Sequence, residues 1–293
     1  MPKSSPLDYS EIRRMAITAV FSDDYFYERV VLKGGNALAL ALGYEGRTSL
    51  DLDFSLENDF EDPADAQQRL KAALDRRFAT VGLVVIDYAF TSRPSIPREG
   101  KPWWGGYAAE FKLLKDVRHV EIGSDKLARG REALVIGPEQ QRKFTIELSK
   151  FEYTAGKISR EIDKFDIYVY APEMIALEKL RALCQQMPQY GLNRIPCARA
   201  RDFFDIHLIV TVTGTKLSSP QNKDLLSNIF AAKEVPLELL QSIADQREFH
   251  RPDWDSVRIS VAHGELKEFD FYFDYVVEQV VLLQPLGEVQ API

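Results

Sequence analysis

The feature that most constrains this chain is a stretch near its start, where a hydrophobic run leads into two adjacent glycines and an apolar helical segment. The run is Val30–Leu32, and Gly34 and Gly35 follow it after Lys33. Glycines lack a Cβ, so their backbone N–H groups can approach a phosphate closely. A helix that begins directly after them points the positive end of its dipole at the same anion. The stretch therefore predicts a phosphate-binding turn.

Two carboxylates follow the helical segment after a short linker. Asp51 and Asp53 alternate with apolar residues, so a strand here would carry both carboxylates on one face. The apolar residues are Leu50, Leu52 and Phe54. Two such carboxylates repel each other unless a cation lies between them, and Mg²⁺ prefers oxygen ligands and also binds phosphates. Together with the glycines, the pair is typical of a nucleotidyl or phosphoryl transferase.

Each half of this stretch has a simpler explanation. A pair of turn glycines and a solvent-facing acidic edge would account for the two halves separately, and either half alone would favour that explanation. The order of the two halves and their apolar flanks favour the functional interpretation. The alternative in which both aspartates face solvent stays open.

Composition limits the partners and the location that we expect. A net charge of −7 argues against broad, non-specific nucleic-acid binding, which needs a positive surface, but it leaves room for an RNA held by a local basic patch. Two cysteines, Cys184 and Cys197, are too few for a disulfide framework. No apolar run is long enough to span a bilayer, and residues 1–5 lack the apolar segment of a secretory signal. We therefore expect a cytoplasmic protein without a membrane partner.

Residue patterns predict an α/β lobe followed by a mostly helical lobe, with a boundary near residue 165. In the first part we expect helices over residues 7–21 and 63–78, a helix or loop over 23–29, a loop over 91–106, and strands over 83–90, 107–114, 143–149 and 166–170. Farther along we expect helices over 172–183, 198–212, 221–232 and 236–246, while 269–283 fits either a helix or a strand.

Basic side chains gather in and after the predicted loop. The loop carries Trp103 and Trp104 together with Arg93, Arg98 and Lys101. We favour tryptophans that tuck back onto the body, and the alternative is a loop that stacks on a nucleobase or on RNA. A basic run follows, which is usually a solvated face but can also be a substrate patch. It contains Lys112, Lys115, Arg118, His119, Lys126, Arg129 and Arg131.

The helical lobe carries a second constellation of charged residues. Lys179 lies among apolar residues in the predicted helix 172–183. In the next helix Asp202 and Asp205 share one face, and Arg199 precedes Asp202 by three residues. Salt bridges within each helix, such as Arg199 with Asp202, explain an isolated match of this kind. The presence of the first stretch upstream makes the functional interpretation the better one for Lys179 and Asp202.

Four ordered blocks of the chain resemble the AbiEii/MenT-like nucleotidyltransferase toxins of the DNA polymerase β-like superfamily. The blocks are GGNAL, SLDLDFS, EKLRAL and RARDFFD, which extend to about residue 210. The family's usual form is close to LKGGTAL followed by RFSxDLDFS. This chain departs from it by Asn36 in place of Thr, by Thr48 in place of an aromatic residue, and by Leu50 where an acid is common. None of these changes removes a metal ligand.

The resemblance implies an α+β fold. A nucleotidyltransferase lobe, with a mixed sheet and flanking helices, would occupy residues 1–165, and a mainly helical lobe over 166–293 would complete the active site. A nucleoside triphosphate (NTP) is the implied substrate and Mg²⁺ the implied cofactor, held by Asp51 and Asp53. A third carboxylate comes from a later strand in this superfamily. Glu147 is our candidate and Glu110 the next, although an exposed strand glutamate explains Glu147 almost as well.

The resemblance also assigns roles to individual residues. Lys179 would contact the nucleotide phosphates, and Asp202 would be a further active-site acid. Ser49 is the position where some relatives are controlled by antitoxin-driven phosphorylation, which would add about −1.5 to −2 charges beside the phosphates. The predicted nucleotide-binding residues are Lys33, Gly34, Gly35, Asn36, Arg47 and Ser49. Arg199, Arg201 and Asp205 are expected to serve structure or contact between lobes.

The implied function is a toxin of a toxin–antitoxin pair that transfers a nucleoside monophosphate to RNA at the 3′ end of tRNA. A cognate antitoxin protein is the implied partner. Two alternatives stay open at this point. One is a transferase that acts on a small molecule, such as an antibiotic, or on a protein. The other is a non-catalytic relative that only binds a nucleotide or a partner.

Overall fold

A computed structural model of the chain describes residues 9–42, 51–136, 141–192, 195–260 and 266–283. The chain forms two compact units. The first comprises Met1–Asn36, Thr48–Thr154 and Ile158–Val169. The second comprises Ala37–Arg47, Ala155–Lys157 and Tyr170–Ile293, so it takes in two short segments from earlier in the chain. The lobe boundary that we predicted near residue 165 stays a prediction.

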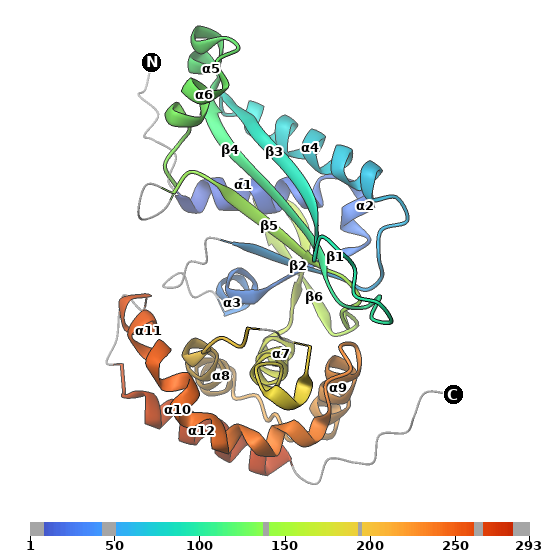
Figure 1. Ribbon diagram of the computed structural model, residues 1–293, viewed down its shortest axis with the longest axis vertical. Coiled ribbons are helices and arrows are strands. Elements are labelled where there is room, and N and C mark those ends of the chain that lie inside the picture. Colours follow the sequence, from blue (N-terminus) through green and yellow to red (C-terminus); the bar gives the residue numbers. More distant parts are fainter. Residues whose placement is uncertain (1–8, 43–50, 137–140, 193–194, 261–265, 284–293) are drawn as a thin grey trace. The chain divides into compact units, whose positions relative to one another are not determined.

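A mixed seven-stranded sheet lies at the centre of the first unit (Figure 1). Its strand order is β3-β4-β5-β2-β1-β7-β6. The strands are β1 (Val30–Lys33), β2 (Leu52–Leu56), β3 (Leu83–Arg93), β4 (Gly106–Lys115), β5 (Phe144–Ser149), β6 (Lys157–Ile162) and β7 (Phe165–Tyr170). β2 pairs antiparallel with β1 and parallel with β5, while β4 pairs antiparallel with both β3 and β5. This mixed sheet with flanking helices confirms the predicted α+β class.

Helices cover one face of this sheet. The helices of the first unit are α1 (Tyr9–Phe21), α2 (Asp24–Tyr27), α4 (Pro63–Ala79), α5 (Asp116–Ile122) and α6 (Lys126–Glu132), and α3 (Gly34–Leu42) begins in it. α1 packs on α4, and α4 packs on β3. Apolar strand residues point toward these helices, as the ring contact of Phe78 with Phe111 at 6.0 Å shows. The start of α4 is fixed because Asp62 caps it and Pro63 occupies its first turn.

The second unit is helical, as expected. Its α-helices are α7 (Pro172–Cys184), α8 (Ala200–Thr213), α9 (Pro220–Ala231), α10 (Arg247–His250), α11 (Trp254–Ser260) and α12 (Phe269–Leu283). Among the described residues, the 3₁₀ segments η2 (Pro188–Tyr190), η3 (Leu237–Gln246) and η4 (Arg251–Asp253) accompany them. α7 packs against α8, α9 and η3, while α12 packs against α8 and η3 (Figure 1). Residues 269–283, which fitted a helix or a strand, are helical.

Several elements differ from the predictions for physical reasons. We predicted only a basic run where α5 and α6 lie. Neither short helix has a buried residue, so neither has the buried apolar stripe by which a helix is usually recognised in a sequence. β6 was not predicted, since this edge strand is mostly polar and exposed. Strands β3 and β4 extend into the predicted loop, which leaves residues 94–105 as the connection.

Candidate functional site

Three charged residues form a row across the centre of the sheet. Lys33 at the end of β1 pairs in register with Asp53 in β2, and Asp53 pairs in turn with Glu147 in β5. Residues directly opposite each other on neighbouring strands lie on the same face of a sheet. The β1–β2–β5 order therefore brings Asp53 beside Glu147, although the two residues are 94 positions apart in the sequence.

Gly34 begins helix α3 directly after Lys33 and touches the carboxylate of Asp53. Its φ angle is +69°, a conformation that residues with a side chain rarely adopt. A Cβ built at Gly34 would stand only 2.5 Å from Oδ2 of Asp53. Because Gly34 has no side chain, the carboxylate of Asp53 on the neighbouring strand can lie against the first turn of α3. Gly35 follows in the same turn and is partly exposed.

Asn36 connects the same turn to the residue that precedes β2. Its Nδ2 donates a hydrogen bond of 2.7 Å to the backbone carbonyl of Asp51. The side chain of Asp51 itself is exposed, and its charge acts on Tyr9 of α1. Burial raises the pKa of Tyr9 to about 12, with Arg13 opposing the shift and Asp51 adding to it. Asp51 therefore stands at an open end of β2, beside the start of α3.

Lys33 has a counter-ion that we did not predict. Its Nζ lies 3.4 Å from Oε1 of Glu152, and both side chains are largely buried. The backbone N–H of Glu152 donates to the carbonyl of Leu56, which fixes this residue beside the end of β2. Glu152 lies after β5 in a segment without a motif, so the sequence carries no signal for it. The predicted contact of Lys33 with the triphosphate stays a prediction.

The carboxylates of this row suit an open metal site. In the parts of the chain that the structure describes, no three His, Cys, Asp or Glu residues gather closely enough to hold a metal by themselves. Mg²⁺ usually keeps several waters and binds through one or two carboxylates plus substrate phosphates. Asp51 and Asp53, next to a glycine-rich helix start, fit such a site. Glu147 is exposed beside Asp53, and its role as a third ligand stays a prediction.

A second cluster lies inside the helical unit. Nζ of Lys179 on α7 lies 2.7 Å from Oδ1 of Asp202 and 2.7 Å from Oδ2 of Asp205, both on α8. Arg199 donates through Nε to the other oxygen of Asp202. Burial raises the pKa of Asp202, but the charges of Arg199 and Lys179 outweigh it and hold that pKa well below its usual range. Two cations and two carboxylates thus form one electrically balanced, mostly buried group.

The start of α8 is held by residues from a distant segment. The backbone N–H of Arg199 donates to Nδ1 of His250 at 3.0 Å, and that of Ala200 donates to Oδ2 of Asp253 at 3.0 Å. Burial lowers the pKa of His250 to about 4, so the imidazole is neutral and can accept this bond at neutral pH. The partner of His250 is a backbone group, and no sequence motif marks a contact of this kind.

Two predicted residues lie outside the described part of the chain. Arg47 and Ser49 belong to residues 43–50, and nothing in the structure bears on their predicted roles. The remaining candidates fall into two groups. The first unit holds Lys33, Gly34, Gly35, Asn36, Asp51, Asp53 and Glu147, and the second unit holds Lys179 and Asp202.

The loop between β3 and β4 carries the two adjacent tryptophans. Both rings are partly exposed, and their centroids lie 6.0 Å apart in an edge-to-face arrangement. The guanidinium of Arg98 lies 4.9 Å from the Trp104 ring, and Nζ of Lys101 lies 5.3 Å from the Trp103 ring. At the base of the loop, the N–H of Lys150 donates to the carbonyl of Gly105. The loop therefore presents aromatic faces and cations side by side.

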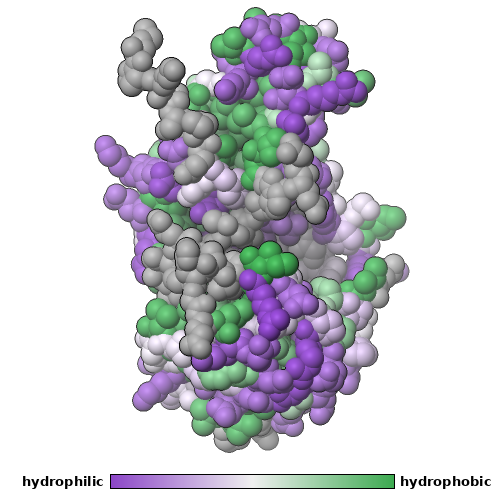
Figure 2. All heavy atoms as spheres, turned by 90° about the vertical axis from the view of Figure 1, so that its left-hand side faces the viewer, coloured by the Kyte–Doolittle hydropathy of each residue, from purple (hydrophilic) through white to green (hydrophobic). Residues whose placement is uncertain are grey.

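The basic run is partly neutralised. Lys112 pairs with Asp87 at 2.8 Å, and Arg118 pairs with Glu121 and Glu132. α5 and α6 also expose apolar side chains among the charged ones, at the top of Figure 2. These are Val117, Val120 and Leu127. This mixture is a weaker match to a nucleic-acid surface than a continuous basic patch would be.

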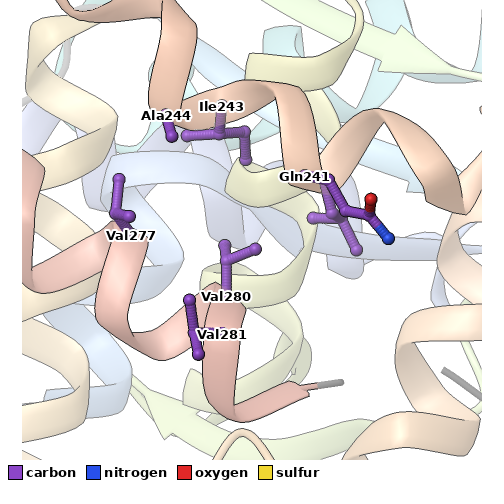
Figure 3. Close-up of a pocket in the computed structure, with 7 residues that line it drawn as sticks. Gln241, Ile243, Ala244, Val277, Val280 and Val281 are labelled. Atoms are coloured by element: carbon purple, nitrogen blue, oxygen red, sulfur yellow. The ribbon is translucent and has the colours of Figure 1, made fainter. Parts of the chain in front are cut away.

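An apolar cavity of about 350 Å³ lies in the helical unit, between η3 and α12 (Figure 3). Aliphatic side chains and one amide line it, and none of its lining residues is charged. Such a lining offers nothing to hold a triphosphate, so we do not assign the transfer site to this cavity. The lining residues are Leu240, Gln241, Ile243, Ala244, Val277, Val280 and Val281.

Comparisons with known proteins place the chain in a wider context. The model of a family described as nucleotidyl transferase AbiEii toxin, type IV TA system, matches residues 16–275. Comparison with curated protein sequences gives no match. A similar solved structure is an antigenic nucleotidyltransferase-like protein from Paracoccidioides brasiliensis, with 17% identity over 80% of this chain and 94% of that chain, and a TM-score of 0.37. We draw nothing further from a likeness at this level. No helix in the described ranges is both long and apolar enough to cross a membrane.

Proposed function

We propose a specific reaction for this chain on the basis of its family, since it belongs to the AbiEii nucleotidyl transferase toxins of type IV toxin–antitoxin systems. The chain is a transferase of nucleotides. We infer that it moves a nucleoside monophosphate from an NTP to the 3′ acceptor end of tRNA and so blocks translation. The observation that supports this proposal is the contact of the Asp53 carboxylate with Gly34, where the strand that carries a proposed metal ligand meets the start of a helix suited to phosphates.

The first unit supplies the groups that such a reaction needs. The N-terminal turn of α3, with Gly34 and Gly35, would hold the phosphates through backbone N–H groups, and Lys33 would add positive charge. Mg²⁺ bound by Asp51 and Asp53 would lower the pKa of the attacking hydroxyl and neutralise charge on the departing pyrophosphate. The hydroxyl oxygen bonds to the α-phosphorus, and the bond to the β-phosphate oxygen breaks. Pyrophosphate leaves with that electron pair, and the hydroxyl proton passes to solvent.

The buried cluster of the helical unit suggests a supporting role for its members. Burial raises the pKa of Asp202, but the charges of Arg199 and Lys179 lower it by more. The pKa therefore lies far below the working pH, and Asp202 stays ionised. A carboxylate of this kind is a poor proton acceptor, since an efficient general base has a pKa near the operating pH. We therefore propose that Asp202 holds Lys179 and Arg199 in place. Lys179 would then act as a charged phosphate contact, as the family resemblance implies.

The β3–β4 loop has the side chains that an RNA acceptor needs. RNA ends carry unpaired bases that stack on aromatic side chains and phosphates that attract cations. The β3–β4 loop offers both, through Trp103 and Trp104 with Arg98 and Lys101. A local surface of this kind would reconcile an RNA acceptor with a net charge of −7. An antitoxin protein as partner and a cytoplasmic location complete the proposal.

A transfer assay with different acceptors tests this function. The protein is incubated with Mg²⁺ and each labelled NTP in turn, with total tRNA, an aminoglycoside or a protein mixture as acceptor. We expect label on tRNA, and we expect it to disappear with Asp51→Ala. Glu61→Ala, an exposed acid on the same unit, is the matched control and should keep the activity. Label on the antibiotic or on protein, but not on RNA, would replace the proposed acceptor with the alternative one.

A further inference from the structure

Asn36 is almost fully buried, with 2% of its surface exposed, and its amide has a fixed orientation. Its Nδ2 faces the carbonyl of Asp51 at 2.7 Å. A carbonyl oxygen can only accept a hydrogen bond, so the amide cannot be the other way round. Oδ1 therefore points away from Asp51. It is buried as well, and no residue in the described ranges donates a hydrogen bond to it.

A buried acceptor without a donor costs stability, on the order of 1–3 kcal/mol. An apolar side chain at position 36 would avoid this cost. The amide nevertheless makes one strong connection, between the first turn of α3 and the residue that leads into β2. Gly34 makes the second connection between the same elements, through its contact with Asp53. The two aspartates are thus held at two points, one by its side chain and one by its backbone.

We propose that Asn36 is a positioning residue that orients Asp51 for the metal, and that its Oδ1 accepts a hydrogen bond from a water or hydroxyl donor in the loaded site. This inference rests on the proposed function. Asn36 acts through the backbone of Asp51, because its bond to that carbonyl holds the backbone position from which the exposed side chain extends. An amide oxygen repels phosphate, so Oδ1, which has no donor among the described residues, is suited to a donor and not to the triphosphate itself.

A double-mutant cycle separates this role from a direct contact with the nucleotide. Binding of Mn²⁺ alone is measured by electron paramagnetic resonance for the wild type, Asn36→Ala, Asp51→Ala and the double variant. We expect Asn36→Ala to weaken Mn²⁺ binding about tenfold, and to weaken it less than twofold in the Asp51→Ala background. Asn36→Thr keeps a hydroxyl that can donate to the same carbonyl, and it should recover part of the loss.

The matched control is Asn222→Ala in the helical unit, because Asn222 also donates its amide to a backbone carbonyl, that of Lys216 at 2.9 Å. It should leave Mn²⁺ binding unchanged. Unchanged Mn²⁺ binding in Asn36→Ala, or an equal loss with and without the Asp51 carboxylate, would overturn the proposal. Failure of both Asn36 variants to fold would also overturn it, since the role would then be structural. The Mn²⁺ measurement needs no acceptor, so it stands even if the transfer assay finds no labelled RNA.

Discussion

The carboxylate of Asp53 occupies the place where a side chain at Gly34 would begin. A Cβ at Gly34 would lie 2.5 Å from Oδ2 of Asp53, and the glycine has a φ angle of +69°. Space and backbone conformation both require glycine here. The same contact brings β2, which carries the proposed metal ligand Asp53, to the start of α3, so we expect the glycine to serve the site as well as the turn.

Gly34→Ala should therefore abolish nucleotide transfer, with a loss of at least a hundredfold. The control is Gly82→Ala, because Gly82 has nearly the same φ angle, +70°, but no atom within 4 Å of the added Cβ. Both variants should lose about 1–2 kcal/mol of folding free energy from the left-handed conformation, and Gly34→Ala should lose more from the collision. Urea unfolding and the transfer assay together measure this. A Gly34→Ala enzyme as active as Gly82→Ala would contradict the assignment of this turn to the site.

Removing Lys179 should destabilise the helical unit strongly. Lys179→Met leaves Asp205, which is fully buried, and Asp202 without a shared cation. Breaking a buried pair on one side costs about 3–5 kcal/mol. Lys71→Met breaks the exposed pair with Asp75 on α4 and should cost less than about 1 kcal/mol. Urea unfolding compares the two variants, and equal losses would show that the Lys179 cluster is not a buried network in solution.

His250 should make stability fall in mild acid. Its pKa is lowered by burial to about 4 from an ordinary 6.5. Between these values the unfolded chain binds a proton at this imidazole and the folded chain does not. The free energy of unfolding therefore decreases as the pH is lowered from about 6.5 to about 4. His207, whose pKa burial also lowers, contributes in the same direction.

The variant His250→Asn tests this source of the pH dependence. An Asn side-chain oxygen can still accept the N–H of Arg199 but does not titrate. Unfolding free energies measured from pH 7 to pH 4 should depend less on pH in this variant than in the wild type. An unchanged slope would show that the imidazole is not the titrating group. Loss of ionised Asp202 acts only at more acidic pH, because the pKa of that carboxyl is depressed.

The tryptophan pair should matter for RNA and not for the nucleotide. Replacing Trp103 and Trp104 together by Ala should raise the KM for tRNA about tenfold, since stacking contributes about 1–3 kcal/mol per base. The KM for the NTP should not change. Phe271→Ala removes an exposed aromatic ring from the helical unit and serves as the control. An unchanged KM for tRNA in the double variant would remove the loop from the proposed acceptor surface.

Local patterns predicted much of the fold. Alternating apolar residues predicted β5, and the predicted helix 63–78 corresponds to α4, whose start is fixed within one turn by the Asp62 cap. The class of fold followed from family resemblance and is confirmed. β6, α5 and α6 were missed because elements that bury few residues leave no hydrophobic period to detect.

The sequence predicted those site residues that lie in short local patterns. It did not predict residues that only tertiary packing brings to the site. The glycines and the two aspartates form a short ordered pattern, and Lys179 and Asp202 fall in blocks shared with the family. Glu152 beside Lys33, and His250 beside Arg199, come from segments brought together by tertiary packing alone. Glu152 pairs with a single lysine charge and His250 with a backbone N–H group, and neither kind of contact leaves a pattern in the sequence.

The central claim is that this chain transfers nucleotides at Asp51 and Asp53, and the position of the transferred label tests it most directly. One NTP is supplied with the label on its α-phosphate and, in a parallel reaction, on its γ-phosphate, with tRNA as acceptor. We predict that only the α-label enters the RNA, that the γ-label appears in pyrophosphate, and that Asp53→Ala abolishes both products. Transfer of the γ-label instead, or full activity of Asp53→Ala beside the Glu61→Ala control, would contradict it.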